Sequence, residues 1–190
     1  MQSQKDETVF IGGPEKTEIR IVDYNPEWPA QYQHHASIIT AALGDALLRI
    51  EHIGSTSVPG LAAKAVIDIL VVVPDSADEP SYLSKLELAG YELRVREPDF
   101  YEHRMLRTSA RDVHIHIYSP GVPEIERNIA FRDWLRTHPE DRKLYEDTKR
   151  SLAKQSWSHM DAYAQAKTEV IESIIASALA GLINSNSSPC

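Results

Sequence analysis

The sequence predicts an α+β fold, in which a mixed β-sheet flanked by helices is followed by a helical C-terminal part. Apolar runs of strand length occupy residues 47–53 and 65–73, and an alternating segment follows at 113–118. After Pro120-Gly121 the apolar residues recur with the period of a helix. With 190 residues and 42% hydrophobic content, the chain can bury one core. We therefore expect a single domain over residues 18–180, between a flexible lead (1–17) and a disordered tail (181–190).

The predicted elements begin with a strand at 18–24, where apolar residues alternate. Asn25 is a good helix cap and Pro26 suits a first turn, so a helix should follow to about Leu43. Gly90 would end a further helix. The remaining elements are expected as strands at 47–53, 65–73 and 91–95, a helix at 80–89, a hairpin of 102–107 with 113–118, and helices at 123–137, 139–155 and 159–179.

Composition excludes several classes of protein. No window approaches the roughly 20 consecutive apolar residues of a membrane span, and the polar N-terminal residues do not resemble a secretory signal. The single cysteine, Cys190, permits no internal disulfide and no zinc site built from cysteines. A formal net charge of −8 disfavours duplex nucleic acid as a partner, whereas local basic clusters still permit a small anionic ligand. We expect a cytoplasmic protein that does not bind membranes.

The turn between the two central strands is rich in glycine and hydroxyl groups. Gly54 and Gly60 permit positive φ, and Pro59 fixes φ near −65°. Exposed backbone N–H groups can gather in such a turn, as they do around a phosphate. The side chains that could assist there are Ser55, Thr56, Ser57 and Lys64.

The strand that follows the turn carries one carboxylate, Asp68, within the apolar run Val66–Val73. A strand this apolar has little reason to carry a charge unless the charge is paired or used. Asp68 is therefore the first candidate for a functional residue.

Five motifs together resemble the GrpB family, in the expected order and over about residues 18–176. They are Tyr24-Asn-Pro-Glu-Trp28, His52-Ile-Gly-Ser-Thr-Ser-Val-Pro-Gly-Leu61, the Asp68 strand, His114-Ile-His116 and Phe131-Arg-Asp-Trp-Leu-Arg-Thr-His-Pro139. The resemblance implies the fold of the DNA polymerase beta-type nucleotidyltransferases. In that superfamily a Gly-Ser pair holds a nucleotide phosphate, an Asp-x-Asp pair on the next strand holds divalent metal, and a third carboxylate completes the site.

This sequence keeps only part of that plan. Gly54 and Ser55 match the phosphate pair, and Asp68 matches the first carboxylate. Leu70 replaces the second carboxylate, and two histidines stand where the third is expected. Two-metal phosphoryl transfer needs several carboxylates to hold hard Mg²⁺ ions about 4 Å apart. The resemblance thus implies a nucleotidyltransferase-like transferase with an incomplete carboxylate triad.

Asp68, His114 and His116 have the composition of a site for Fe, Mn, Ni or Zn that is built from two histidines and one carboxylate. The period of a strand places both imidazoles on one face. We expect these residues to be catalytic and to be metal ligands, with a divalent ion such as Mg²⁺, Mn²⁺ or Zn²⁺ as the candidate cofactor. The alternative is a polar pocket in which the pair binds substrate or transfers protons without metal.

The register of the predicted hairpin decides what faces His116. If the turn centres on Ala110, Arg104 lies opposite and could clamp an anion; a slip of one residue puts His103 there as a third imidazole. The sequence leaves both open. His52, before the Gly-Ser turn, resembles the histidine that the family has there, or it simply caps the strand end.

Four further cations are candidates for holding a negatively charged substrate. Lys64 lies between the turn and Asp68. Arg132, Lys149 and Lys167 fall on the predicted C-terminal helices, where most basic side chains are solvated, and the resemblance makes them candidates for the site.

Three functions remain open. The first is an enzyme of nucleotidyltransferase fold that acts on a nucleotide or another anionic small molecule. The second is a repurposed enzyme for cyclisation, condensation or elimination that uses the histidine pair. The third is a catalytically inactive module that binds phosphate or nucleotide. The family is joined to a dephospho-coenzyme A kinase domain in some proteins, which favours nucleotide or coenzyme metabolism, but this chain has no G-x-x-x-x-G-K-S/T loop.

Overall fold

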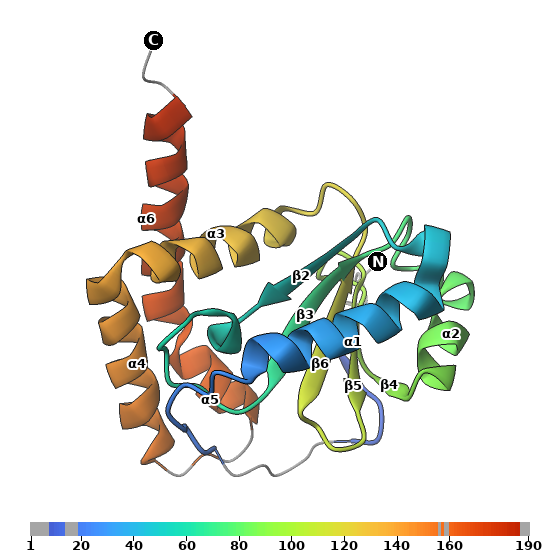
Figure 1. Cartoon of the computed structure of the whole chain (residues 1–190), viewed down its shortest axis with the longest axis horizontal. Coiled ribbons are helices and arrows are strands. Elements are labelled where there is room, and N and C mark those ends of the chain that lie inside the picture. Colours follow the sequence, from blue (N-terminus) through green and yellow to red (C-terminus); the bar gives the residue numbers. More distant parts are fainter. Residues whose placement is uncertain (1–7, 14–18, 156, 158–159, 187–190) are drawn as a thin grey trace, which may run out of the picture.

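The computed structural model describes residues 8–13, 19–155, 157 and 160–186. Within them, one mixed sheet has the strand order β1-β4-β5-β6-β3-β2. β3 and β6 are parallel, whereas the other neighbouring strands are antiparallel (Figure 1). The strands are β1 (Val9–Phe10), β2 (Arg49–Ile53), β3 (Ile67–Val72), β4 (Tyr91–Glu97), β5 (His103–Thr108) and β6 (Val113–Tyr118).

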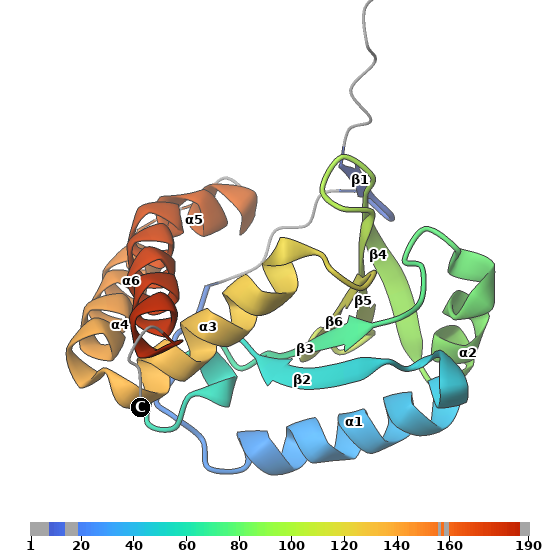
Figure 2. The same ribbon diagram turned by 90° about the horizontal axis from the view of Figure 1, so that it is seen from above.

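Helices cover both faces of the sheet (Figure 2). α1 (Trp28–Leu43) and α2 (Leu83–Leu88) pack on one face, where Ile39 and Leu86 join the core that contains Ile69. α3 (Pro123–Thr137) crosses the other face, where its Ile125 packs with Leu70. Because β3 is covered on both sides, its residues 69–72 are all apolar and buried.

The C-terminal helices gather beyond one end of the sheet (Figures 1 and 2). They are α4 (Pro139–Ala153), α5 (Met160–Ala166) and α6 (Thr168–Asn186). Val58 and Leu61, from the turn after β2, pack into a core with Tyr145 of α4 and Ile174 of α6. The helical part thus closes over the turn that the sequence singled out.

The fold class expected from the sequence is confirmed, and several of the expected elements are corrected. Of the strand expected at 18–24, the structure describes residues 19–24, and among these only Val22 forms a bridge, exchanging two hydrogen bonds of 2.9 Å with Ala63. Ala63 lies in the irregular connection before β3, which offers no neighbouring ladder to extend the pair.

The first helix begins at Trp28 rather than at Pro26. Asn25 still stabilises the turn that leads into the helix, because its Oδ1 accepts a hydrogen bond of 2.9 Å from the backbone N–H of Glu27. The helix expected at 159–179 is two helices, α5 and α6, separated at Lys167, and residues 158–159 lie outside the described residues.

Parts of the expected lead and tail form regular structure. Val9 and Phe10 pair with β4 as strand β1, and α6 continues through residues 181–186. Residues 1–7, 14–17 and 187–190 of those two segments lie outside the described residues. None of the helices that the structure describes combines the length and apolarity needed to cross a membrane.

Candidate metal and anion site

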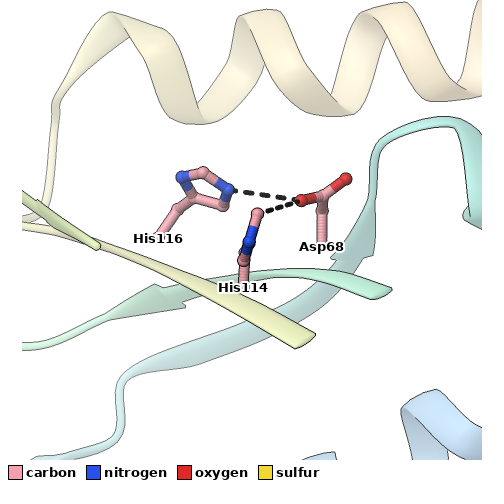
Figure 3. A group of neighbouring side chains, drawn as sticks. All are labelled: Asp68, His114 and His116. Carbon is pink, nitrogen blue, oxygen red and sulfur yellow. Dashed lines mark ion pairs between the residues drawn. The ribbon is translucent and has the colours of Figure 1, made fainter. Parts of the chain in front are cut away.

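Asp68, His114 and His116 lie together on the sheet face that α3 crosses (Figure 3). The parallel register of β3 and β6 places Asp68 beside His114 and Leu70 beside His116. Oδ1 of Asp68 lies 3.6 Å from Nδ1 of His114 and 3.5 Å from Nε2 of His116. One ligand atom from each residue lies within 4.8 Å of the other two, which is compact enough to surround a single ion.

The three side chains combine partial burial with access to solvent. The exposed fractions are 29% for Asp68, 24% for His114 and 25% for His116, so a ligand can reach all three. Burial would raise the pKa of Asp68, but hydrogen bonding and charge from the two imidazoles outweigh it, and the pKa lies below its usual range. At neutral pH the side chain of Asp68 is therefore a negatively charged carboxylate that could act as a metal ligand.

Gly54 follows directly after β2 and packs against Asp68. Its φ of 69° and ψ of −175° belong to a backbone region that is essentially restricted to glycine. A Cβ built on Gly54 would lie 2.5 Å from Oδ2 of Asp68. The glycine is needed both for its backbone conformation and for the space that the carboxylate occupies.

A pocket of about 220 Å³ opens beside Asp68. The turn after β2, the strands β3 and β6, and the helices α4 and α5 contribute its walls. The polar residues that line it are Ser55, Thr56, Lys64, Asp68, His114, Tyr145, Lys149, Tyr163 and Lys167. The structure thus brings Lys64, Lys149 and Lys167, all predicted from sequence, to the same pocket as Asp68.

Lys149 and Lys167 are held against tyrosine rings. Nζ of Lys149 lies 4.6 Å from the ring centroid of Tyr145, and Nζ of Lys167 lies 4.5 Å from that of Tyr163. Lys149 Nζ also donates to Oγ of Ser55 at 2.9 Å and to the carbonyl of Ala62. Burial, reinforced by the charge of Lys167, lowers the pKa of Lys149 to about 7.

Lys64 and Lys167 are also affected by the enclosed site. Burial lowers the pKa of each, while the charge of Asp68 opposes that shift. Three amines thus face a pocket lined by one carboxylate, and an anionic ligand would offset their mutual repulsion. The chemistry of the walls favours a phosphate or a carboxylate.

Sequence reasoning missed the two tyrosines, although a signal was present. The pattern Tyr-x-x-x-Lys occurs at 145–149 and again at 163–167. Residues four apart lie on the same side of a helix, so Tyr145 accompanies Lys149 into the pocket from α4. Lys167 lies in the turn just after α5, and there it still meets the ring of Tyr163.

His52 and Thr56 support the turn from behind. Oγ1 of Thr56 donates to the carbonyl of Val66 at 3.1 Å, so Nε2 of His52, also 3.1 Å away, must donate to that hydroxyl. The imidazole stacks on Tyr32, with ring centroids 4.6 Å apart. Burial lowers the pKa of His52 to about 4 and keeps the ring neutral.

Ser57 is part of the same support. Its hydroxyl donates to the carbonyl of Gly54, and its own carbonyl accepts a hydrogen bond of 2.8 Å from Nη2 of Arg136. His52 and Ser57 were candidates for substrate binding, but the structure places them among the groups that shape the turn.

The hairpin has neither of the registers considered from sequence. Met105, not Arg104 or His103, lies opposite His116, and Arg104 pairs with Ile117. Arg111 adopts a φ of 63° in the turn, a conformation that sequence spacing does not reveal. The pairing is therefore displaced by one residue from a turn centred on Ala110 with Arg104 facing His116.

This register separates the two candidates. Arg104 lies on the opposite face of the sheet, where its Nε donates to Glu79 at 2.6 Å, so it does not reach the site. His103 shares the face of His116, and its Nε2 lies 3.1 Å from Nδ1 of that residue. Its Nδ1 lies 2.7 Å from Oε2 of Glu97, a residue that sequence reasoning missed.

Arg132 is also outside the pocket. Its guanidinium donates to Glu51 at 2.8 Å, to the carbonyl of His52 at 3.1 Å and to Asp133 at 2.8 Å. These contacts fasten α3 to β2. The structure thus gives Arg132 an anchoring position rather than the substrate-binding position expected from sequence.

The fold and the site describe an α+β protein with a lysine-lined pocket beside a cluster of one carboxylate and two imidazoles. The chain belongs to the GrpB family: the model of the family described as GrpB protein matches residues 18–177. This confirms the family resemblance carried by the sequence motifs.

Relatives with a solved structure or a curated sequence support this family assignment. The crystal structure of conserved protein GrpB from Enterococcus faecalis has a TM-score of 0.75 and 34% identity, covering 86% of this chain and 99% of that one. A UPF0157 protein of Streptomyces coelicolor is 50% identical, and the match covers 87% of each protein. A dephospho-CoA kinase of Mycolicibacterium paratuberculosis is 33% identical over 78% of this chain but only 43% of the kinase. A weaker likeness in fold, to the Cid1 poly(U) polymerase, has a TM-score of 0.44 and 10% identity.

Proposed function

We propose that this chain is a metal-dependent enzyme that acts on a small anionic substrate. The observation that carries the proposal is the cluster of Asp68, His114 and His116, whose ligand atoms lie within 4.8 Å of one another beside a pocket lined by three lysines. In this arrangement a metal ion bound by the cluster would lie next to an anionic group bound by the lysines. Such a pairing suits a reaction at a phosphate or carboxylate group.

The donor set favours a borderline transition metal over Mg²⁺. Magnesium prefers oxygen ligands in octahedral geometry, whereas one carboxylate with two imidazoles suits Zn²⁺, Mn²⁺ or Fe²⁺. Leu70, at the position of the expected second carboxylate, is fully buried against α3 and contributes no oxygen. The metal ion would supply Lewis-acid activation of a bound oxygen.

The lysines would orient the substrate and neutralise its charge. Lys149 is fixed by its contacts with Ser55 and Ala62, so it is preorganised rather than mobile. Lys64 and Lys167 approach from the loop before β3 and from the junction of α5 and α6. A group that bridges them and the metal would be held in one orientation, as positioning catalysis requires.

A nucleotide or coenzyme is the substrate class we favour. The relative named dephospho-CoA kinase supports it, because this chain matches part of a protein with that name. The pocket volume of about 220 Å³ suits a phosphate-bearing portion of such a molecule rather than the whole. A transferase is the corresponding reaction class, and a cyclisation, condensation or elimination is the alternative.

Calorimetric titration of metal-stripped protein tests the metal site. Zn²⁺, Mn²⁺ and, without oxygen, Fe²⁺ are titrated into the wild type, Asp68→Asn and the double variant His114→Ala, His116→Ala. Asp75→Asn, an exposed position on the loop after β3, is the matched control. We expect one ion per chain, lost in both site variants and kept in the control. No site tighter than millimolar in the wild type would overturn metal dependence and leave the histidines as acid and base.

The substrate class is tested by a second titration. Pyrophosphate, ATP and coenzyme A are added with and without the metal found above, to wild type, Lys167→Met and the control Lys143→Met, whose side chain is 72% exposed. Binding that weakens in Lys167→Met but not in the control supports the anion pocket. Turnover of any ligand that binds, measured by chromatography of the products, separates an enzyme from an inactive binding module.

A further inference from the structure

A chain of side chains runs from the candidate metal site into the sheet. Nδ1 of His116 lies 3.1 Å from Nε2 of His103, whose Nδ1 lies 2.7 Å from Oε2 of Glu97. The other nitrogen of His116, Nε2, faces Asp68 at 3.5 Å. Three adjacent strands, β4, β5 and β6, thus contribute one residue each to a single line of contacts.

Hydrogen-bond counting assigns the protons along this line when a metal is bound. A metal ion needs the lone pair of Nε2 of His116, so the proton of that neutral ring must be on Nδ1. The Nδ1–H group then needs an acceptor, and Nε2 of His103 is the acceptor within reach. His103 must in turn carry its proton on Nδ1, where the Glu97 carboxylate, which can only accept, receives it.

We infer that Glu97 and His103 are positioning residues that hold His116 in the tautomer whose Nε2 is free to bind the metal. The inference rests on the proposed metal site and adds the groups that would prepare it. In metal sites generally, a ligating histidine donates its second N–H to a partner that fixes its tautomer and orientation.

The surroundings of His103 fit a residue held in one orientation. Glu97 and His103 are direct cross-strand partners at the end of the β4–β5 hairpin. His103 is only 5% exposed, and its ring stacks on Tyr118, with centroids 4.8 Å apart. The hairpin loop reaches it through Tyr101 and Glu102, both with left-handed φ values, 57° and 53°. Two consecutive non-glycine residues with left-handed φ values are energetically unfavourable. Such a conformation persists only where the surrounding structure enforces it.

The variants Glu97→Gln, His103→Leu and His103→Gln separate positioning from a merely structural role. Glutamine at 97 keeps the shape of glutamate but can donate as well as accept, so the two tautomers are no longer enforced. Leucine at 103 removes the acceptor for His116. Glutamine at 103 can accept from His116 and donate to Glu97, and should restore the line. Glu92→Gln, on the same strand β4 with an exposed side chain, is the control.

Zn²⁺ affinity by competition titration is the first measurement. We expect affinity to fall about 10- to 100-fold in Glu97→Gln and His103→Leu, which is the usual effect of losing such a partner. His103→Gln should recover most of the loss, and Glu92→Gln should match the wild type. Equal affinity in wild type and Glu97→Gln, or no recovery in His103→Gln when it is folded by circular dichroism, would overturn the inference.

The tautomer of His116 is the second measurement, read from long-range ¹⁵N–¹H correlations in metal-free protein at pH 8 and again with Zn²⁺. We expect Nδ1 to carry the proton in the wild type and mixed protonation in Glu97→Gln. Protonation at Nε2 in the wild type would overturn the inference. If the wild type shows the Nδ1 tautomer but binds none of the metals, the proposed function fails while the positioning role stands.

Discussion

The carboxylate of Asp68 occupies the space where a side chain on Gly54 would begin. A Cβ at residue 54 would lie 2.5 Å from Oδ2 and 3.1 Å from Cβ of Asp68. The turn after β2 and the candidate metal ligand on β3 are therefore packed as one unit. A side chain at residue 54 must therefore displace Asp68 or the turn itself.

Gly54→Ala should disturb both folding and the metal site. Backbone strain and the clash with Asp68 together should cost about 2 to 5 kcal/mol in the free energy of unfolding. Gly60→Ala is the matched control, because its φ of 77° is also positive but a Cβ there meets nothing within 4 Å. Urea denaturation measures both variants. A Gly54→Ala variant no less stable than Gly60→Ala would show that the close approach carries no cost.

His52 should make the protein sensitive to mild acid. Its pKa falls from 6.5 to about 4 on folding because of burial, so between those values the unfolded chain binds more protons. Stability should therefore fall as pH drops from 6.5 toward 4. His52→Gln can still donate to Thr56, and it should flatten this part of the profile of urea midpoint against pH. His34→Gln, at an exposed position, should leave it unchanged.

Lys149 should make stability depend on pH in the alkaline range. Its pKa falls from 10.5 to about 7, so the cost of burying its charge is fully present below pH 7 and is relieved as pH rises. Relative to Lys149→Met, the wild type should gain stability between pH 7 and 9, with a slope of up to about 1.4 kcal/mol per pH unit. Denaturation of both proteins at several pH values measures it. Parallel curves would contradict the burial of this charge.

Arg132 should matter for stability and not for ligand binding. Arg132→Ala takes a charged donor away from the carbonyl of His52 and from Glu51, which keeps Nε of Arg49 at 3.2 Å, and the loss is worth about 1.5 to 3 kcal/mol. Arg132→Lys keeps the charge but not the planar fork, and should recover only part of it. Metal and pyrophosphate titrations of the folded variants should match the wild type. A tenfold weaker anion affinity in Arg132→Ala would return this residue to the site.

Local pattern was sufficient for most of the fold. The run Val66–Val73 predicted a strand, and the structure forms β3 there with α1 and α3 covering its two faces. The prediction of a strand at 18–24 was wrong. Alternation of apolar residues indicates a half-buried extended segment, but it does not show that a partner strand is available to pair with it. Only Val22 found one, in Ala63.

The candidate site divides in the same way. Asp68, His114 and His116 could be grouped from sequence because the family resemblance places them in one site and the period of a strand puts both imidazoles on one face. That β3 and β6 are adjacent and parallel came from the structure. The role considered for Arg104 depended on the register of the hairpin, and that for Arg132 on how α3 packs on the sheet. In the structure both residues lie outside the pocket and pair with glutamates instead.

The sequence by itself determined the family, the α+β fold class and the residues that could hold a metal ion, since these follow from motifs and from periodicity along the chain. Only the tertiary structure decided that Glu97 and His103 stand behind His116, and that Lys149 and Lys167 line one pocket with the turn after β2. Those contacts join residues from separate strands and helices. They depend on the register of the β4–β5–β6 ladder and on how the C-terminal helices pack, which no local pattern specifies.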